Sequence, residues 1–243
     1  MKRTLGLLAV VSLVAGGWAM GQGAGDAKPT AYVAATKTPP KIDGKLDDEA
    51  WKTATVIHLT RTLDGASAAA QPTEVRLLRD DATLYLAFRC TEPAMNQLTP
   101  GDTGADVSVW TGDSMEFFLG LGCDYCHFGV DAAGGTYDAE AKDAGWASGM
   151  MAAVSKGTNE WIAEVAVPSD KILPGKGTKP RKEWTANFNR NRYVTGVLEE
   201  MAWSPTFSGD SHMPERFGKL IFADPPQPGS GQGAGGVSAK DNK

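Results

Sequence analysis

The stretch Trp110-Thr111-Gly112-Asp113-Ser114-Met115-Glu116-Phe117-Phe118-Leu119-Gly120 joins a loop with an aromatic residue to a short apolar strand that carries one acid. Side chains alternate between the two faces of a strand, so the sequence predicts Met115, Phe117 and Leu119 on the face toward a core. Glu116 then points the opposite way, close to Trp110. A carboxylate next to an exposed indole supplies what a sugar site needs, a flat apolar wall and an acceptor for hydroxyls. An edge strand with a solvated Glu116 and a Trp110 packed in its loop is the alternative.

Short strands separated by Gly- and Asp-rich turns flank this stretch on both sides. Residues 73–79 alternate between apolar and polar side chains, and a turn at 80–83 leads into a return strand at 84–90. Single helical turns are expected at 47–51 and 168–173, and no long amphipathic helix occurs. The sequence therefore predicts an all-β protein, a single antiparallel β-sandwich. The other expected strands are 127–131, 136–138, 150–154, 160–167, 184–193 and 216–222.

The two ends of the chain differ from this central part. Lys2 and Arg3 precede an apolar run, and a small-residue site follows near Ala19, which is typical of a signal peptide. The segments on either side of the domain hold too little apolar surface to offset their ordering entropy. We therefore expect a secreted or periplasmic protein without stable membrane insertion after cleavage. The expected segments are a signal peptide at 1–20, a flexible linker at 21–30, one domain at 31–223 and a disordered tail at 224–243.

The chain has more acidic than basic residues, which argues against some classes of binding partner. The formal net charge is −5 at pH 7, and removal of Lys2 and Arg3 with the signal peptide leaves 22 basic against 29 acidic residues, a charge of −7. Such a chain is a poor candidate for binding nucleic acid or an anionic membrane surface. No internal repeat or long linker divides the domain, and we expect a monomer.

Five motifs in a fixed order point to one family. They are Ile42-Asp43-Gly44 with residues 47–51, residues 80–88, Trp110 with Asp113-Ser114-Met115-Glu116, residues 184–192, and Trp203-Ser204-Pro205 with residues 214–218. Through these motifs the chain resembles a family 9 carbohydrate-binding module, in the wider DOMON-like group of jelly-roll β-sandwiches. The resemblance covers residues 40–222. It implies non-catalytic binding of a saccharide, in modules that often accompany glycoside hydrolases and assist polysaccharide breakdown.

The resemblance also assigns roles to individual residues. In sugar-binding members two Trp residues sandwich a terminal sugar, and Trp110 matches the first of them. Glu116 matches an acid that binds hydroxyls, while Asn189 and Asp131 fall at positions that carry polar side chains. With His212, discussed next, these are the substrate-binding residues that we expect.

Two positions depart from the family pattern. Ser211 stands at the second Trp, and His212 is the nearest ring able to replace it. Gly129 stands at a family Arg and has no side chain to donate a hydrogen bond. One aromatic wall instead of two forfeits about 1 kcal/mol or more of stacking. We expect His212 to face Trp110 across the groove and to bind sugar less well once its ring is protonated.

The segment Cys123-Asp124-Tyr125-Cys126-His127 offers an alternative function. It matches the C-x-x-C-H signature of c-type haem attachment, in which both thiols bind the haem vinyl groups and the histidine binds the iron. Some DOMON-like relatives bind haem, which supports the alternative by analogy only. The competing interpretation is a surface turn with a Cys pair, oxidised or free, followed by a strand whose outward face includes His127. Cys90 ends an apolar strand and is expected to be buried.

Three further features have a functional and a structural interpretation. Asp43, Asp47 and Asp48 could hold a structural calcium ion, or they could cap a solvated turn. In residues 187–192 the Asn side chains share one face and the Arg side chains the other, and we place the Asn face in the groove with Glu116. Catalysis is not expected, because no Ser-His-Asp order, H-E-x-x-H motif, phosphate loop or identifiable pair of catalytic carboxylates occurs.

Overall fold

The computed structural model describes residues 27–121, 124–140, 142–172 and 182–224. The predicted signal peptide and nearly all of the predicted C-terminal tail lie outside these residues. The described part is almost entirely strand, so the all-β prediction is confirmed. The strands are β1 (Thr30–Tyr32), β2 (Ala34–Ala35), β3 (Thr55–Thr62), β4 (Ala68–Arg79), β5 (Thr83–Thr91), β6 (Ser114–Leu121), β7 (Asp124–Asp131), β8 (Thr136–Glu140), β9 (Met151–Lys156), β10 (Glu160–Pro168), β11 (Glu183–Arg192), β12 (Glu199–Ala202) and β13 (Gly218–Ile221). The helical elements are α1 (Ser169–Ile172) and the 3₁₀ turns η1 (Glu49–Thr53), η2 (Met95–Gln97), η3 (Val109–Thr111) and η4 (Pro214–Arg216).

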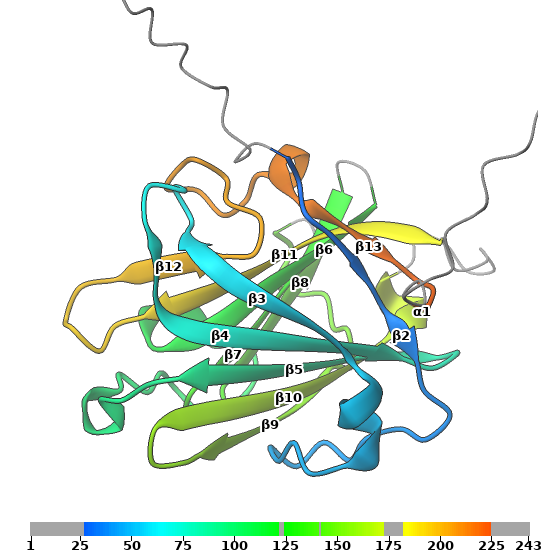
Figure 1. The fold of residues 1–243 in the computed structure, drawn as a ribbon, viewed down its shortest axis with the longest axis horizontal. Coiled ribbons are helices and arrows are strands. Elements are labelled where there is room, and N and C mark those ends of the chain that lie inside the picture. Colours follow the sequence, from blue (N-terminus) through cyan, green and yellow to red (C-terminus); the bar gives the residue numbers. More distant parts are fainter. Residues whose placement is uncertain (1–26, 122–123, 141, 173–181, 225–243) are drawn as a thin grey trace, which may run out of the picture.

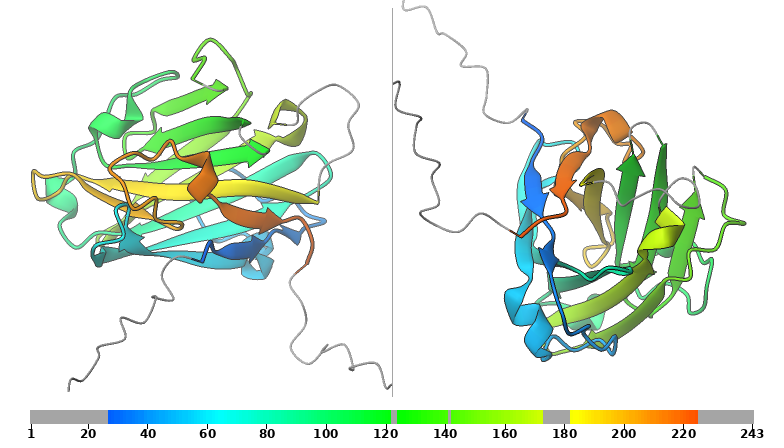
Figure 2. Two further views of the ribbon diagram at one scale, coloured as in Figure 1. Left: turned by 90° about the horizontal axis from the view of Figure 1, so that it is seen from above. Right: turned by 90° about the vertical axis from the view of Figure 1, so that its right-hand side faces the viewer.

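The strands form one sheet that folds over into two facing layers (Figures 1 and 2). The order β8-β7-β6-β11 makes one layer, and β3-β4-β5-β10-β9 makes the other. β12 joins them, because it pairs with β11 on one side and with β3 on the other. Neighbouring strands are antiparallel except β1 with β13 and β2 with β4. The predicted antiparallel sandwich is confirmed, with layers that share a hydrogen-bonded edge.

Some strand boundaries differ from the sequence predictions. β4 begins at Ala68 rather than at residue 73, because its first residues pair with β3 although alanines have little preference for strands. β1, β2 and β12 were not among the predicted strands. The helical turn expected at 168–173 is found as α1, and the one expected at 47–51 overlaps η1. None of the described helices is long and apolar enough to span a bilayer.

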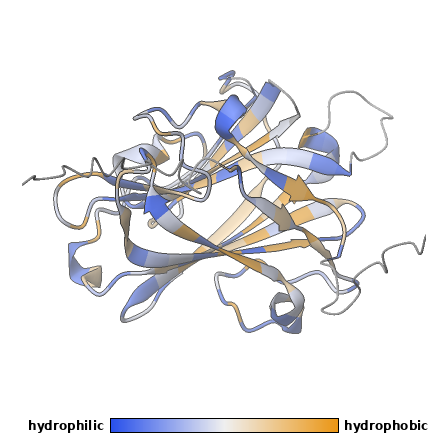
Figure 3. Cartoon of the chain, turned by 45° about the horizontal axis from the view of Figure 1, so that its top comes forward, coloured by the Kyte–Doolittle hydropathy of each residue, from blue (hydrophilic) through white to orange (hydrophobic). Residues whose placement is uncertain are grey.

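Apolar side chains fill the space between the two layers, and Figure 3 shows hydrophobic residues along the strands. Met115 and Phe117 of β6 point inward and are fully buried, as their alternation predicted. Phe117 stacks on Phe128 of β7 at 4.8 Å and lies 5.6 Å from Phe88 of β5, in the opposite layer. Each fully buried side chain of this size contributes about 1.5–3 kcal/mol. This core holds β6 in place, and Glu116 and Phe118 point away from it on the other face of the strand.

A buried acid explains the opening motif of the domain. Glu164 of β10 is fully buried and accepts hydrogen bonds from the backbone N–H groups of Asp43 and Gly44 and from Nε1 of Trp51, at 2.9, 2.8 and 2.7 Å. Gly44 has a φ of +81°, and a Cβ there would meet the backbone of Ser155 at 2.9 Å. The glycine and the tryptophan are therefore required because the segment folds tightly over one carboxylate.

The inward face of β11 carries two arginines inside the sandwich. Arg190 and Arg192 both bond Glu92, which follows β5 in the opposite layer. Arg192 binds it with two nitrogens, at 2.6 and 3.1 Å. Glu92 and Arg190 are fully buried, so the charges compensate one another in the core. This ion cluster fastens β11, the central strand of the pocket layer, to the opposite layer.

Candidate functional site

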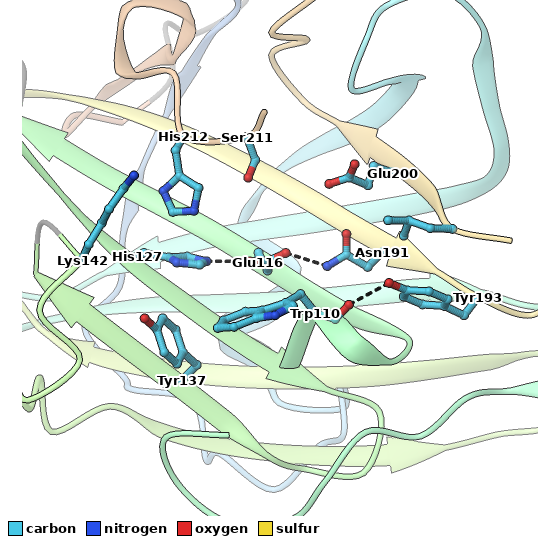
Figure 4. Close-up of a pocket in the computed structure, with 11 residues that line it drawn as sticks. Trp110, Glu116, His127, Tyr137, Lys142, Asn191, Tyr193, Glu200, Ser211 and His212 are labelled. Carbon is cyan, nitrogen blue, oxygen red and sulfur yellow. Dashed lines mark hydrogen bonds and ion pairs between the residues drawn. The ribbon is translucent and has the colours of Figure 1, made fainter. Parts of the chain in front are cut away.

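One pocket of about 500 Å³ opens on the outer face of the layer formed by β6, β7 and β11 (Figure 4). Its volume is in the usual range of ligand sites. In Figure 4 Trp110 and Tyr137 lie on one side, His212 and Ser211 lie on the other, and Glu116 and His127 lie between them. We call it the Trp110 pocket. Its lining residues are Trp110, Glu116, His127, Tyr137, Lys142, Asn191, Tyr193, Leu198, Glu200, Ser211 and His212.

Trp110 is held in the short turn η3 with its indole partly open to solvent. Trp110 is 38% exposed. Its ring and that of Tyr137 meet edge to face, with 5.0 Å between the ring centroids. Tyr193 donates a hydrogen bond from its hydroxyl to the carbonyl oxygen of Trp110 at 2.9 Å. Val109 packs against Gly129, where an added Cβ would come within 2.3 Å of Val109 Cγ2. The glycine that replaces a family arginine therefore lets the Trp110 turn lie close to the sheet.

The residues between Trp110 and Glu116 fasten this turn to the strand. Asp113 accepts hydrogen bonds from the backbone N–H groups of Thr99 and Tyr193, at 2.8 and 3.3 Å. Gly112 lies so close to Thr99 that a Cβ would come within 2.6 Å of its carbonyl oxygen. The Gly and Asp of this motif therefore place Trp110 and have no direct part in the pocket.

Glu116 forms the floor of the pocket and is only 5% exposed. Its Oε1 accepts a hydrogen bond from Asn191 Nδ2, and its Oε2 lies the same distance, 2.6 Å, from His127 Nε2. Two partners on opposite sides fix the orientation of the carboxylate. Each carboxylate oxygen can accept a second hydrogen bond, so acceptor capacity remains for a ligand.

Three rings lie side by side above the strands. The His127 ring stacks on Phe118 at 4.4 Å with an interplanar angle of 11°, because the two residues are direct partners across β6 and β7. The Trp110 ring is nearly parallel to the His127 ring, with 6.2 Å between their centroids and an interplanar angle of 25°. The pocket therefore has an aromatic surface that extends beyond the tryptophan.

His212 provides the opposite wall, and Figure 4 places it across the pocket from Trp110. Its Nδ1 lies 2.8 Å from the hydroxyl of Tyr125, and its ring meets His127 edge to face at 5.0 Å. Burial lowers the pKa of His212, and the nearby charge of His127 lowers it further. The neutral ring is therefore favoured in this position.

The domain that carries this pocket matches a family model. The model is described as "Carbohydrate family 9 binding domain-like", and it matches residues 42–223. The chain belongs to this family. A comparison with curated proteins gives no match.

Solved structures of family 9 carbohydrate-binding modules share the fold. One from Caldicellulosiruptor kristjanssonii in complex with cellotriose has 16% identity and a TM-score of 0.60, covering 82% of this chain and 96% of its own. The same organism's module in complex with glucose has 16% identity and a TM-score of 0.59, covering 82% and 98%. A carbohydrate-binding protein, so described, from Bacteroides uniformis has 15% identity and a TM-score of 0.63, covering 81% and 100%. At these identities the likeness shows the fold alone.

Two of the family-derived site residues lie outside the pocket lining. Asp131 accepts hydrogen bonds from the backbone N–H groups of Ala133 and Gly135, at 2.8 and 2.9 Å, and so holds the β7–β8 turn. Asn189 pairs directly with Glu116 in the sheet, yet it is fully buried and its amide has no partner among the described residues. Asn191, two residues along the same face, is the amide that reaches Glu116.

The C-x-x-C-H segment is only partly described, because Cys123 lies outside the described residues. Cys126 is buried in the core on the inner face of β7, while His127 is on the pocket face with its Nε2 on Glu116. A thioether at Cys126 and an axial bond from His127 would have to form on opposite faces of one strand. The described geometry therefore favours the strand interpretation over haem attachment in this family member.

Two of the three acids considered as calcium ligands, Asp43 and Asp48, have protein partners. Asp43 pairs with Lys41 Nζ at 2.8 Å, and Asp48 accepts a hydrogen bond from the Lys41 backbone N–H at 3.0 Å. Across the part of the chain that the structure describes, no group of three or more His, Cys, Asp or Glu side chains is placed to hold a metal ion. These acids tie the turn that leads into η1.

Proposed function

We propose that the Trp110 pocket binds a saccharide without chemical conversion. The observation that carries the proposal is a partly exposed indole in the same pocket as a buried carboxylate that has one partner on each oxygen. A pyranose has an apolar C–H face and a rim of hydroxyls, so it needs both a flat apolar wall and fixed acceptors. Membership of the family and the cellotriose and glucose complexes of its relatives support the same ligand class.

In this proposal the sugar lies with one face on Trp110 and its hydroxyls toward Glu116. The free acceptor sites of the Glu116 oxygens take hydroxyl protons, and Asn191 and His127 keep the carboxylate in position. His212 replaces the second aromatic wall of the family, and it can also exchange a hydrogen bond with a hydroxyl. The protein is exported in this proposal, which its charged and then apolar N-terminal sequence supports.

Substitution of Trp110 by alanine tests the proposal. We expect saccharide affinity to fall by about tenfold or more, equivalent to about 1.4 kcal/mol, because the stacking surface is lost. The free energy of unfolding should fall by less than about 1.5 kcal/mol, since the side chain is partly solvated. Isothermal titration calorimetry with glucose, cellobiose and cellotriose measures binding in both proteins, because the variant lacks the fluorescent side chain beside the ligand. Denaturant unfolding measures stability.

Met151→Ala is the matched control, because Met151 is 62% exposed on β9 and does not line the pocket. It should leave affinity unchanged. A parent protein that binds no saccharide in calorimetry or fluorescence, together with a large stability loss in Trp110→Ala, would assign Trp110 to packing and remove the proposal.

A further inference from the structure

The Trp110 pocket contains two carboxylates with different surroundings. Glu116 has one partner on each oxygen, as described above. Glu200 of β12 also lines the pocket, yet its carboxylate has no hydrogen bond or ion pair within the described residues. Glu200 additionally borders a neighbouring hollow of about 260 Å³, so it is reachable from solvent and from the pocket. It is an available acceptor at one end of the site.

The described groups around Glu200 provide no cation for its carboxylate. Burial raises the pKa of Glu200, and the negative charges of Glu116 and Asp210 raise it further. Arg192, on the neighbouring strand β11, faces the core and is occupied by Glu92 and Glu199. Lys142 lies at the other end of the pocket in Figure 4. Among the residues that the structure describes, the Glu200 end therefore lacks a cation, and a cationic ligand group bound there would stabilise the charged carboxylate.

We propose that the pocket prefers sugars that carry a free ammonium group, hexosamines with an unsubstituted amine, and that Glu200 binds this group. The proposal rests on the proposed saccharide function and names its substrate class. An ammonium group compensates the charge of Glu200 and donates hydrogen bonds to it, whereas a hydroxyl can donate a hydrogen bond but brings no compensating charge. An acidic sugar would add a third negative charge beside Glu116 and Glu200 and is disfavoured there.

Direct comparison of matched sugars tests this preference. At about pH 6 the amine of glucosamine is protonated, whereas N-acetylglucosamine and glucose are neutral and glucuronate is anionic. We expect the dissociation constant of glucosamine, measured by calorimetry in low salt, to be roughly three- to tenfold lower than those of the two neutral sugars. Added salt should weaken glucosamine binding and leave glucose binding nearly constant.

Substitution of Glu200 by glutamine separates its charge from its shape. In Glu200→Gln the ratio of glucosamine to glucose affinity should fall to about one. Asp81→Asn, which removes a negative charge from an exposed residue outside the pocket, should keep the parent ratio. Equal affinities for glucosamine and glucose in the parent, or an advantage that persists in Glu200→Gln, would overturn the inference while saccharide binding stands. Failure of all four sugars to bind would overturn both.

Discussion

Glu92 and Glu116 are buried carboxylates on opposite sides of β11, and their partners differ. Glu92 lies between the layers and is bound by two arginines. A guanidinium group is always positively charged and can only donate hydrogen bonds. Glu116 faces the pocket and is bound by an amide and an imidazole, which leave acceptor sites free. The partners of a buried acid therefore decide its role. A carboxylate neutralised by arginines, such as Glu92, stabilises the fold, whereas one with free acceptor sites, such as Glu116, can still bind a ligand.

The largest effect is expected when Glu92 is replaced by alanine. Arg190 would lose its acid inside the core and Arg192 would keep only Glu199, so the free energy of unfolding should fall by about 3–5 kcal/mol in denaturant titrations. Glu160→Ala is the control, because its pair with Arg89 is partly solvated and should be worth less than about 1 kcal/mol. Similar losses in the two variants would mean that the Glu92 cluster does not fasten the layers.

An intermediate effect is expected for Glu116→Gln, which sharpens the comparison. The amide nitrogen that replaces one oxygen cannot accept a hydrogen bond, so one oxygen is left to accept from Asn191 and from a ligand hydroxyl. Saccharide affinity should fall by about tenfold or more, while the free energy of unfolding falls by about 1–3 kcal/mol, less than in Glu92→Ala. Calorimetric binding and denaturant unfolding of the same preparation give both numbers. Unchanged affinity with a Glu92-like loss of stability would make Glu116 a fold residue.

The smallest effect concerns the pH dependence of His212. Its pKa is lowered in the folded protein by burial, so folding favours the neutral ring, and this contribution is present above the ordinary value of about 6.5 and lost as pH falls through the lowered pKa. Affinity should therefore weaken by a few fold at a pH below that ordinary value, because the charged ring is more strongly hydrated. Tyr125, His127, Glu116, Lys142 and Asp210 are the other groups near this ring.

His212→Phe keeps a ring in the wall and removes its titration. Fluorescence titrations of the parent and of this variant across the acidic range should show a pH-dependent affinity only in the parent. The same profile in both proteins would assign the dependence to another group.

Alternation along single strands predicted the faces of β6 well, and partners across strands explain what it could not predict. Met115 and Glu116 point to opposite sides as expected. His127 was considered as a haem ligand because its neighbours in sequence suggested it, whereas its role follows from pairing opposite Phe118. Its outward phase on the strand after β6, the competing interpretation of the sequence, gave the correct face. Asn189 was expected in the site because it falls at a family position that carries a polar side chain. Asn191 shares its face, and only side-chain geometry separates the two.

The pairing of Glu92 with Arg190 and Arg192 could not be predicted from the sequence either. Residues 187–192 indicate a polar strand, and nothing near them in the chain reveals that Glu92 lies opposite the arginines. The resemblance to the family supplied Trp110, Glu116 and His212, which the pocket brings together. It did not supply Glu200, because Glu200 lies in none of the five motifs that carry the resemblance. Long-range pairs of this kind depend on which strands become neighbours, and that is a property of the folded sheet.

The parallel pair of β1 and β13 has a mechanical consequence. Thr30, Ala31 and Tyr32 lie opposite Lys219, Leu220 and Ile221 in the same direction, and the Lys219 N–H donates to the Pro29 carbonyl oxygen at 2.8 Å. Tension that enters before β1 and leaves after β13 pulls these strands along their length in opposite directions. Their hydrogen bonds are then loaded together in shear and cannot be opened one after another. The first and last strands of the domain thus act as a clasp, and resistance to pulling is set by the rate at which that clasp slips.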